Sequence, residues 1–208
     1  MLAPTLANMA SRAVGASAVR WLDEAVACDI ALPQGIAAVA AEATLRAALA
    51  GEPVDVVVQE EKGRRKKLLL ADMDSTMIDQ ECIDELADEI GLKEHVAAIT
   101  ARSMNGEIAF EPALRERVAL LKGLDAAVVE RIVAGRLTPA SGGRALVQTM
   151  RRAGAHTALV SGGFDVFTGR IAAMLGFHEH RANRLIEAGG VFSGEVAEPI
   201  LGRAAKAE

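Results

Sequence analysis

Tyrosine is absent from this 208-residue sequence, and aromatic residues make up only 3% of it. A hydrophobic core must therefore be built mainly from Ala, Val, Leu and Ile. Cysteine is also scarce, because Cys28 and Cys82 are the only two. Two cysteines cannot form a framework of several disulfides, so we expect a reducing compartment.

Long apolar segments are missing as well. No uninterrupted run approaches the roughly 18 residues that a membrane helix needs, and the longest stretches, such as Ile36–Ala41, end at charged residues. Asn8, Ser11 and Arg12 interrupt the apolar N-terminal stretch, which argues against a signal peptide. We therefore expect a cytoplasmic protein that does not associate with membranes.

Positive charge is not in excess, since the formal net charge is −5. This balance argues against a general nucleic-acid binder, which would be basic. The one dense charge run, EEKGRRKK at Glu60–Lys67, is typical of a solvated linker between two folded parts. A basic patch at Arg64–Lys67 is the alternative, and the two preceding Glu residues disfavour it.

Residues 1–63 are predicted to form a small α/β module. The patterns indicate a helix over Ile36–Ala50 and strands over Val54–Gln59 and, more weakly, Val26–Leu32. A unit of this size is close to the limit for a single core. Two roles stay open for it: a regulatory or dimerising module, or an appendage that packs on the main domain.

Residues 64–208 are predicted to form an α/β domain with a Rossmann-like parallel sheet and a helical cap at about 82–137. Strands are expected at Lys67–Ala71, Ala155–Val160, Asn183–Ile186 and Val191–Val196. Helices are expected at Ile83–Ile90, Glu94–Met104, Glu111–Leu121, Ala126–Ala134, Gly143–Ala153 and Asp165–Leu175. The four helices before Gly143 would interrupt the sheet after its first strand.

An acidic loop, DMDST, follows the first of these strands. Ligands bind at the carboxyl ends of parallel strands, so Asp72 and Asp74 stand where chemistry is expected. One carboxylate could attack a substrate while the other handles a proton, and a cation such as Mg²⁺ would relieve their repulsion. An acidic turn or helix cap is the alternative interpretation of this short motif.

A glycine-rich segment, SGGFD at residues 161–165, follows a later strand and begins a helix. A hydroxyl, two glycines and a helix N-terminus together favour an anion. Both segments should lie at the same edge of the sheet. A phosphate held by Ser161 and Gly162 and attacked from the acidic loop would explain both.

Taken together, LLLADMDST, Glu81, FEPALRERVALL, LVSGGFD and ANRLI…GEVAEPILGRAAK resemble the phosphoserine phosphatase family of haloacid dehalogenase-like hydrolases. The resemblance implies that Asp72 is the nucleophile and that Asp74 is first the general acid and then the general base. It also implies Mg²⁺ held by the Asp72 side chain and the Asp74 carbonyl, phosphate contacts from Ser161 and Gly162, and a neutralising Lys206.

The same resemblance assigns substrate binding to the cap. Glu81 would meet the ammonium group of phosphoserine, Arg117 would grip its carboxylate, and Met104 and Phe110 would line the pocket. A helix-terminal acid and a solvated helix face are the alternatives for Glu81 and Arg117. The expected partner is this small-molecule substrate, with a homodimer left open.

The family pattern continues beyond the point at which this sequence ends, with a GDGxND-like acidic loop and further strands. We therefore expect a domain truncated relative to the family, with Leu68–Leu70 as an exposed apolar edge. Two alternatives remain beside the Mg²⁺-dependent phosphoserine phosphatase of serine biosynthesis. One is a phosphatase or phosphotransferase for another small phosphomonoester, and the other is an incomplete fragment that acts as a binding or regulatory module.

Two further features are interpreted structurally. The segment His178-Glu179-His180 is predicted to be a surface turn, because its spacing does not suit a metal site. Cys82 is predicted to be a packed core residue, since no basic residue flanks it.

Overall fold

The computed structural model describes residues 1–202, and Lys206, for which the sequence predicts a neutralising role, lies outside them. The chain divides into two compact units, Met1–Arg65 and Lys66–Glu208. Within residues 1–202, no helix is long and apolar enough to cross a lipid bilayer.

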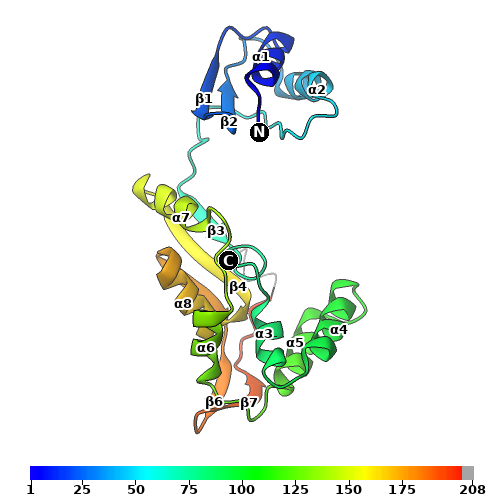
Figure 1. Cartoon of the computed structure of the whole chain (residues 1–208), viewed down its shortest axis with the longest axis vertical. Coiled ribbons are helices and arrows are strands. Elements are labelled where there is room, and N and C mark those ends of the chain that lie inside the picture. The colour runs from blue at the N-terminus through cyan, green and yellow to red at the C-terminus, as the bar shows by residue number, and fades with distance from the viewer. Residues whose placement is uncertain (203–208) are drawn as a thin grey trace. The chain divides into compact units, whose positions relative to one another are not determined.

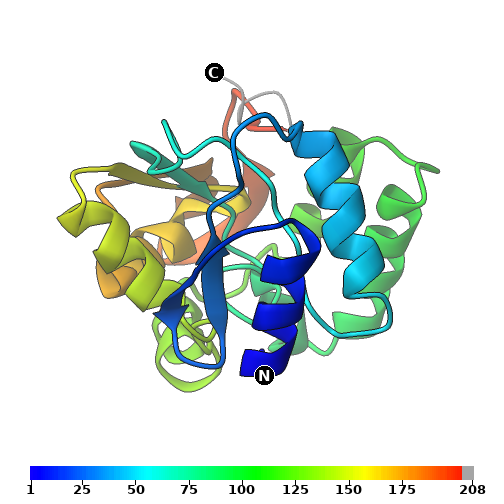
Figure 2. The same ribbon diagram turned by 90° about the horizontal axis from the view of Figure 1, so that it is seen from above.

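Unit 1 consists of helices α1 (Pro4–Ala13) and α2 (Ala38–Ala48) and an antiparallel hairpin of β1 (Val19–Asp23) and β2 (Ala27–Ile30). The two helices lie side by side (Figures 1 and 2). The expected helix and the strand at β2 are present, whereas α1 and β1 were not anticipated. Apolar residues in the two helices or directly after them form the buried core of unit 1: Ala10, Val14, Leu45 and Leu49.

The strand predicted at Val54–Gln59 is wrong, because this segment pairs with no other strand. The segment nevertheless shows the alternation of buried and exposed side chains that is typical of a β-branched strand. Val54, Val56 and Val58 are half-buried against the core of unit 1, and the residues between them are exposed. The alternating pattern therefore indicates that one face of the segment is buried. A β-strand would also need a neighbouring strand with which to form hydrogen bonds.

Unit 2 is built on a parallel sheet in the order β3-β4-β5, with β4 (His156–Phe164) in the centre. β3 (Leu68–Ala71) pairs with β4 so that Ala71 lies opposite Leu159. β5 (Glu179–Asn183) pairs with the other side of β4. Helices α7 (Gly143–Arg152) and α8 (Asp165–Leu175) pack against β4 and against each other.

The expected helical insertion lies between β3 and β4. It contains α3 (Cys82–Asp88), α4 (Lys93–Met104), α5 (Phe110–Ala119) and α6 (Val128–Gly135). Figure 1 shows α4 and α5 side by side, away from the sheet, and α6 beside α8. An antiparallel hairpin of β6 (Leu185–Ala188) and β7 (Val191–Val196) follows β5, and β7 packs on α5.

Two local predictions in unit 2 are wrong. The Ser-Gly-Gly segment is predicted to follow the strand at Ala155–Val160 as a turn, but Ser161–Gly163 extends β4 as far as Phe164, with an irregularity in its pairing to β5. The surface turn expected at His178-Glu179-His180 is instead the start of β5 at Glu179. His180 Nδ1 lies 2.9 Å from Thr168 Oγ1, so contacts with α8 override the low β propensity of this polar segment.

One continuous core joins the sheet to the cap. Its largest fully buried side chains come from both parts: Met73, Ile78, Leu86, Leu114, Leu121, Ile132, Leu159, Phe164, Phe167, Ile171, Leu175 and Phe192. Cys82 is also buried there, as predicted. At the β3 edge of the sheet, Leu68 and Leu70 remain 57% and 45% exposed, which is the apolar edge expected from the sequence.

Candidate active site

The acidic loop begins directly after β3. Its anchor is Met73, whose side chain is fully buried and whose carbonyl accepts hydrogen bonds from the amides of Thr76, Met77 and Ile78. The Asp72 carboxylate accepts the Met73 amide hydrogen at 2.9 Å. Because Met73 is fixed in the core, the two aspartates that flank it are held at the carboxyl end of the sheet.

Asp74 is held by hydrogen bonds from two different elements. Its Oδ2 accepts the hydroxyl hydrogen of Ser161 at 3.0 Å, and its Oδ1 accepts the amide hydrogen of Cys82 at 2.8 Å. Cys82 is the first residue of α3, where backbone amides lack partners within the helix and favour a negative charge. The carboxylate of Asp74 therefore joins the end of β4 to the start of the cap.

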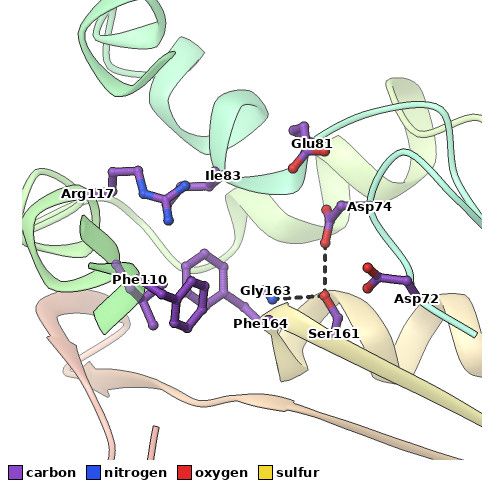
Figure 3. Close-up of a pocket in the computed structure, with 11 residues that line it drawn as sticks. Asp72, Asp74, Glu81, Ile83, Phe110, Arg117, Ser161, Gly163 and Phe164 are labelled. Atoms are coloured by element: carbon purple, nitrogen blue, oxygen red, sulfur yellow. Dashed lines mark hydrogen bonds between the residues drawn. The ribbon is translucent and has the colours of Figure 1, made fainter. Parts of the chain in front are cut away.

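A glycine is required at position 163 because Asp74 and Ser161 lie so close to its backbone. The Gly163 amide donates to Ser161 Oγ at 2.8 Å (Figure 3). A Cβ atom on Gly163 would lie 2.8 Å from Asp74 Oδ2 and 3.1 Å from Ser161 Oγ, so any side chain would displace one of them. The acidic loop and the Ser-Gly-Gly segment at the end of β4 thus meet at one edge of the sheet, as the sequence indicated.

A pocket of about 210 Å³ opens over this edge. Figure 3 shows carboxylates and the serine on one side and Arg117 with aromatic rings on the other. The lining residues are Asp72, Asp74, Glu81, Ile83, Phe110, Leu114, Arg117, Ser161, Gly162, Gly163 and Phe164. The pocket therefore contains most of the side chains that the sequence singled out.

Glu81 precedes α3, and its carboxylate accepts the Ser75 hydroxyl hydrogen at 2.6 Å. Desolvation at the pocket raises the pKa of Glu81, the Ser75 hydrogen bond lowers it, and the charges of Asp74, Asp84 and Asp72 raise it further. The protonated form is thus favoured relative to a glutamate in water. A cation bound beside Glu81 would reverse this preference.

Arg117 extends from α5 and is only 9% exposed. Its Nε donates to the Ala113 carbonyl at 3.1 Å and its Nη1 donates to Thr100 Oγ1 at 3.0 Å. Burial lowers the pKa of Arg117, and the charges of Asp84 and Glu81 oppose that effect. The pocket therefore has a partly desolvated cation on the side away from Asp72.

Two predicted pocket residues differ in their placement. Phe110 is 38% exposed and lines the pocket, with its ring against Gly162, where an added Cβ would lie 3.3 Å from Cζ. Met104, at the end of α4, is 84% exposed and does not line the pocket. Phe110 is therefore part of the pocket lining, and Met104 lies outside it.

Three polar residues at the site were missed by the sequence interpretation. Ser75 holds Glu81, Thr100 holds Arg117, and the buried Asn183 donates its amide to the Gly162 carbonyl at 2.8 Å. Asn183 is the last residue of β5 and stands in the ANRLI stretch, to which the sequence assigned no role in the site. No sequence pattern indicates the roles of Ser75 and Thr100, because each forms its hydrogen bond with a residue that lies elsewhere in the chain.

The donor chemistry at the end of β3 suits a hard divalent cation. Mg²⁺ is bound in proteins by one or two carboxylates with further oxygen atoms from the backbone and water. Asp72 and Asp74 supply carboxylate and carbonyl oxygens within three residues. Among residues 1–202, no group of three or more His, Cys, Asp or Glu side chains is arranged to hold a metal ion.

Known proteins resemble this chain over the same region. A phosphoserine phosphatase of Archaeoglobus fulgidus is 42% identical over 156 residues, which cover 74% of this chain and 45% of that protein. One from Methanocaldococcus jannaschii is 41% identical over 145 residues, or 70% of this chain and 68% of that protein. The chain therefore spans between about half and two thirds of the length of these relatives.

Two solved structures share the fold of unit 2. A phosphoserine phosphatase with a phospho-aspartyl intermediate analogue is 43% identical, with a TM-score of 0.59 over 63% of this chain and 62% of that chain. A substrate-bound phosphoserine phosphatase is 42% identical, with the same TM-score and the same coverage. The haloacid dehalogenase-like hydrolase family matches residues 69–208, a range that contains the acidic loop, the cap, β4 and the elements from α8 to β7. This chain is therefore a member of the haloacid dehalogenase-like hydrolases.

Proposed function

We propose that the protein is a phosphoserine phosphatase, which hydrolyses O-phospho-L-serine to L-serine and inorganic phosphate through an aspartyl-phosphate intermediate. The observation that carries the proposal is the hydrogen bond between Ser161 and Asp74, which brings both loops into one pocket with Glu81 and Arg117. The names of the relatives, and the substrate and intermediate analogue named for two solved structures, support the same activity.

In the first step, a carboxylate oxygen of Asp72 attacks the phosphorus atom. The bond from phosphorus to the seryl oxygen breaks, and protonated Asp74 gives its proton to that oxygen. L-Serine leaves, and the phosphoryl group stays on Asp72 as an acyl phosphate. Splitting the hydrolysis in this way replaces one difficult displacement by two easier ones.

In the second step, the Asp74 carboxylate takes a proton from water as the water oxygen attacks phosphorus. The acyl-phosphate bond breaks, which frees inorganic phosphate and restores Asp72. The hydrogen bonds from Ser161 and Cys82 hold Asp74 in one place for both transfers. A group that acts first as an acid and then as a base needs this fixed position near the reacting oxygen.

The remaining contacts select the substrate. We assign the phosphate to Ser161 and Gly162, the ammonium group to Glu81, and the carboxylate to Arg117. Phe110 covers the pocket beside Gly162. Lys206 keeps the charge-neutralising role expected from the sequence, as a proposal, and no substrate contact is assigned to Met104, which lies outside the pocket.

A divalent cation, which we propose is Mg²⁺, would be held by the Asp72 side chain and the Asp74 carbonyl. When bound, it would neutralise negative charge that gathers as phosphate approaches two carboxylates. We also propose a cytoplasmic enzyme of serine biosynthesis, in which unit 1 serves as a regulatory or dimerising module.

The proposal is tested by phosphate release from a set of phosphomonoesters. We expect O-phospho-L-serine to be the best substrate, followed by phosphomonoesters that lack either the carboxylate or the ammonium group. Release of serine without an equal amount of phosphate, in the presence of an added alcohol, would indicate a phosphotransferase. Equal rates on all esters would contradict the assigned substrate.

A further inference from the structure

Thr100 lies in the cap helix α4, and its side chain contacts Arg117 of α5. The hydroxyl oxygen accepts a hydrogen bond from Arg117 Nη1 at 3.0 Å. The hydroxyl hydrogen is committed elsewhere, because it is donated to the Val96 carbonyl one turn earlier in α4 at 3.1 Å. The oxygen lone pairs are therefore directed at the guanidinium.

Arg117 is fixed at two points, one on each of two helices. Ala113 of its own helix accepts from Nε, and Thr100 accepts from Nη1. Within the described residues these two hydrogen bonds leave Nη2 and one hydrogen of Nη1 for a ligand. Because the guanidinium is planar, fixing two of its nitrogen atoms sets the plane in which the remaining donors point.

We propose that Thr100 is a positioning residue that aims the guanidinium of Arg117 at the carboxylate of the substrate, and so sets the preference for amino-acid phosphomonoesters. This inference rests on the proposed function, since it assigns the carboxylate to Arg117. It adds a residue outside the pocket lining that acts only through Arg117.

A threonine suits this task better than other polar residues. Its β-branched side chain restricts rotation about χ1 in a helix, and the bond to the Val96 carbonyl selects the rotamer that presents the oxygen. Valine has nearly the same shape but no acceptor. Replacing Thr100 by Val would leave a buried Arg117 donor without its partner and would free the guanidinium to rotate.

The test compares Thr100→Val with Thr100→Ser, which keeps the hydroxyl. The matched control is Thr44→Val in α2, where the hydroxyl makes the same bond to a carbonyl one turn earlier, Ala40 at 2.9 Å, in unit 1. The values of kcat and KM are measured for O-phospho-L-serine and for O-phosphoethanolamine, which has the ammonium group but no carboxylate.

We expect Thr100→Val to raise KM for phosphoserine roughly tenfold to hundredfold, as for a lost hydrogen bond to a charged group, with a small change in kcat. Its kinetics on phosphoethanolamine should match the wild type. Thr100→Ser should restore most of the phosphoserine KM, and Thr44→Val should change neither substrate. Equal losses on both substrates, or unchanged phosphoserine KM in Thr100→Val, would overturn the inference.

If the proposed phosphatase function is wrong, the experiment gives a result that differs from a failure of the inference about Thr100. If wild-type protein releases no phosphate, calorimetric binding of the same two compounds replaces kinetics. Weaker binding of phosphoserine alone in Thr100→Val would support the role of Thr100 in a protein that is not this phosphatase. Wild-type protein that binds the two compounds equally would overturn the inference.

Discussion

The hydroxyl of Ser161 lies 3.0 Å from Oδ2 of Asp74 and accepts the amide hydrogen of Gly163 at 2.8 Å. A residue assigned to phosphate binding is thus bonded to the group assigned to proton transfer. In the proposed reaction, a proton on Oδ2 would turn Asp74 from the acceptor into the donor of this hydrogen bond. The shared bond would then couple phosphate binding at Ser161 to proton transfer at Asp74.

This coupling predicts non-additive kinetics. Asp74→Asn and Ser161→Ala should each lower kcat, by roughly 10²–10⁴-fold for the proton-transfer group. The double variant should lose less than the product of the single losses, because either change already breaks the shared hydrogen bond. Steady-state kinetics of the four proteins measures this. Losses that multiply fully would show that the two residues act independently.

Close contact at Gly163 predicts a second effect. Gly163→Ala places a Cβ 2.8 Å from Asp74 Oδ2, so kcat/KM should fall at least about tenfold as the carboxylate is displaced. The matched control is Gly135→Ala in α6, where no atom lies within 4 Å of an added Cβ. It should keep full activity and gain up to about 1 kcal/mol of stability from helix propensity. Full activity of Gly163→Ala would contradict the geometry.

The raised pKa of Glu81 predicts a pH-dependent KM. Because desolvation favours the protonated carboxyl, KM for phosphoserine should rise as the pH falls through this raised pKa. Glu81→Gln should raise KM about tenfold at neutral pH and remove the pH effect. A phosphomonoester without an ammonium group should show neither change. Identical KM profiles for wild type and Glu81→Gln would contradict an ammonium contact.

The same shift has a consequence for stability. A carboxyl group whose pKa is raised by folding stabilises the folded state below its ordinary pKa, and this stabilisation is lost as the pH rises through the raised value. Glu81→Gln should therefore raise Tm at neutral pH, with the difference from wild type shrinking in acid. Thermal unfolding at several pH values checks the sign, and a Tm lowered equally at every pH would be the opposite result.

Sequence patterns predicted the helices of unit 2 closely, and the helix at Asp165–Leu175 coincides with α8. They failed where structure depends on a partner. Val54–Gln59 has a strand composition but pairs with no strand, while the polar Glu179–Asn183 becomes β5 because β4 offers it an edge. Neither outcome is encoded in the local residues.

The candidate site was predictable to a similar degree. Asp72 and Asp74 follow β3 and Ser161 lies near the carboxyl end of β4, so their meeting at one sheet edge could be expected from parallel topology alone. The polar residues that hold the site side chains in place could not be predicted from the sequence. Thr100 is one threonine in a polar helix, and its importance depends on the packing of α4 against α5, which places it beside Arg117.

The most direct test of the account is phosphate release from O-phospho-L-serine with Mg²⁺, compared among wild type, Asp72→Asn and Asp79→Asn. Asp79 lies in the same segment between β3 and α3. Asp79→Asn removes one negative charge, as Asp72→Asn does, at a residue to which no catalytic role is assigned. We predict turnover by wild type and Asp79→Asn. Asp72→Asn should lose roughly 10³-fold or more in kcat with an unchanged circular dichroism spectrum. Chelation of the divalent cation should stop phosphate release by the two active proteins. Turnover by Asp72→Asn equal to that of wild type would contradict the account.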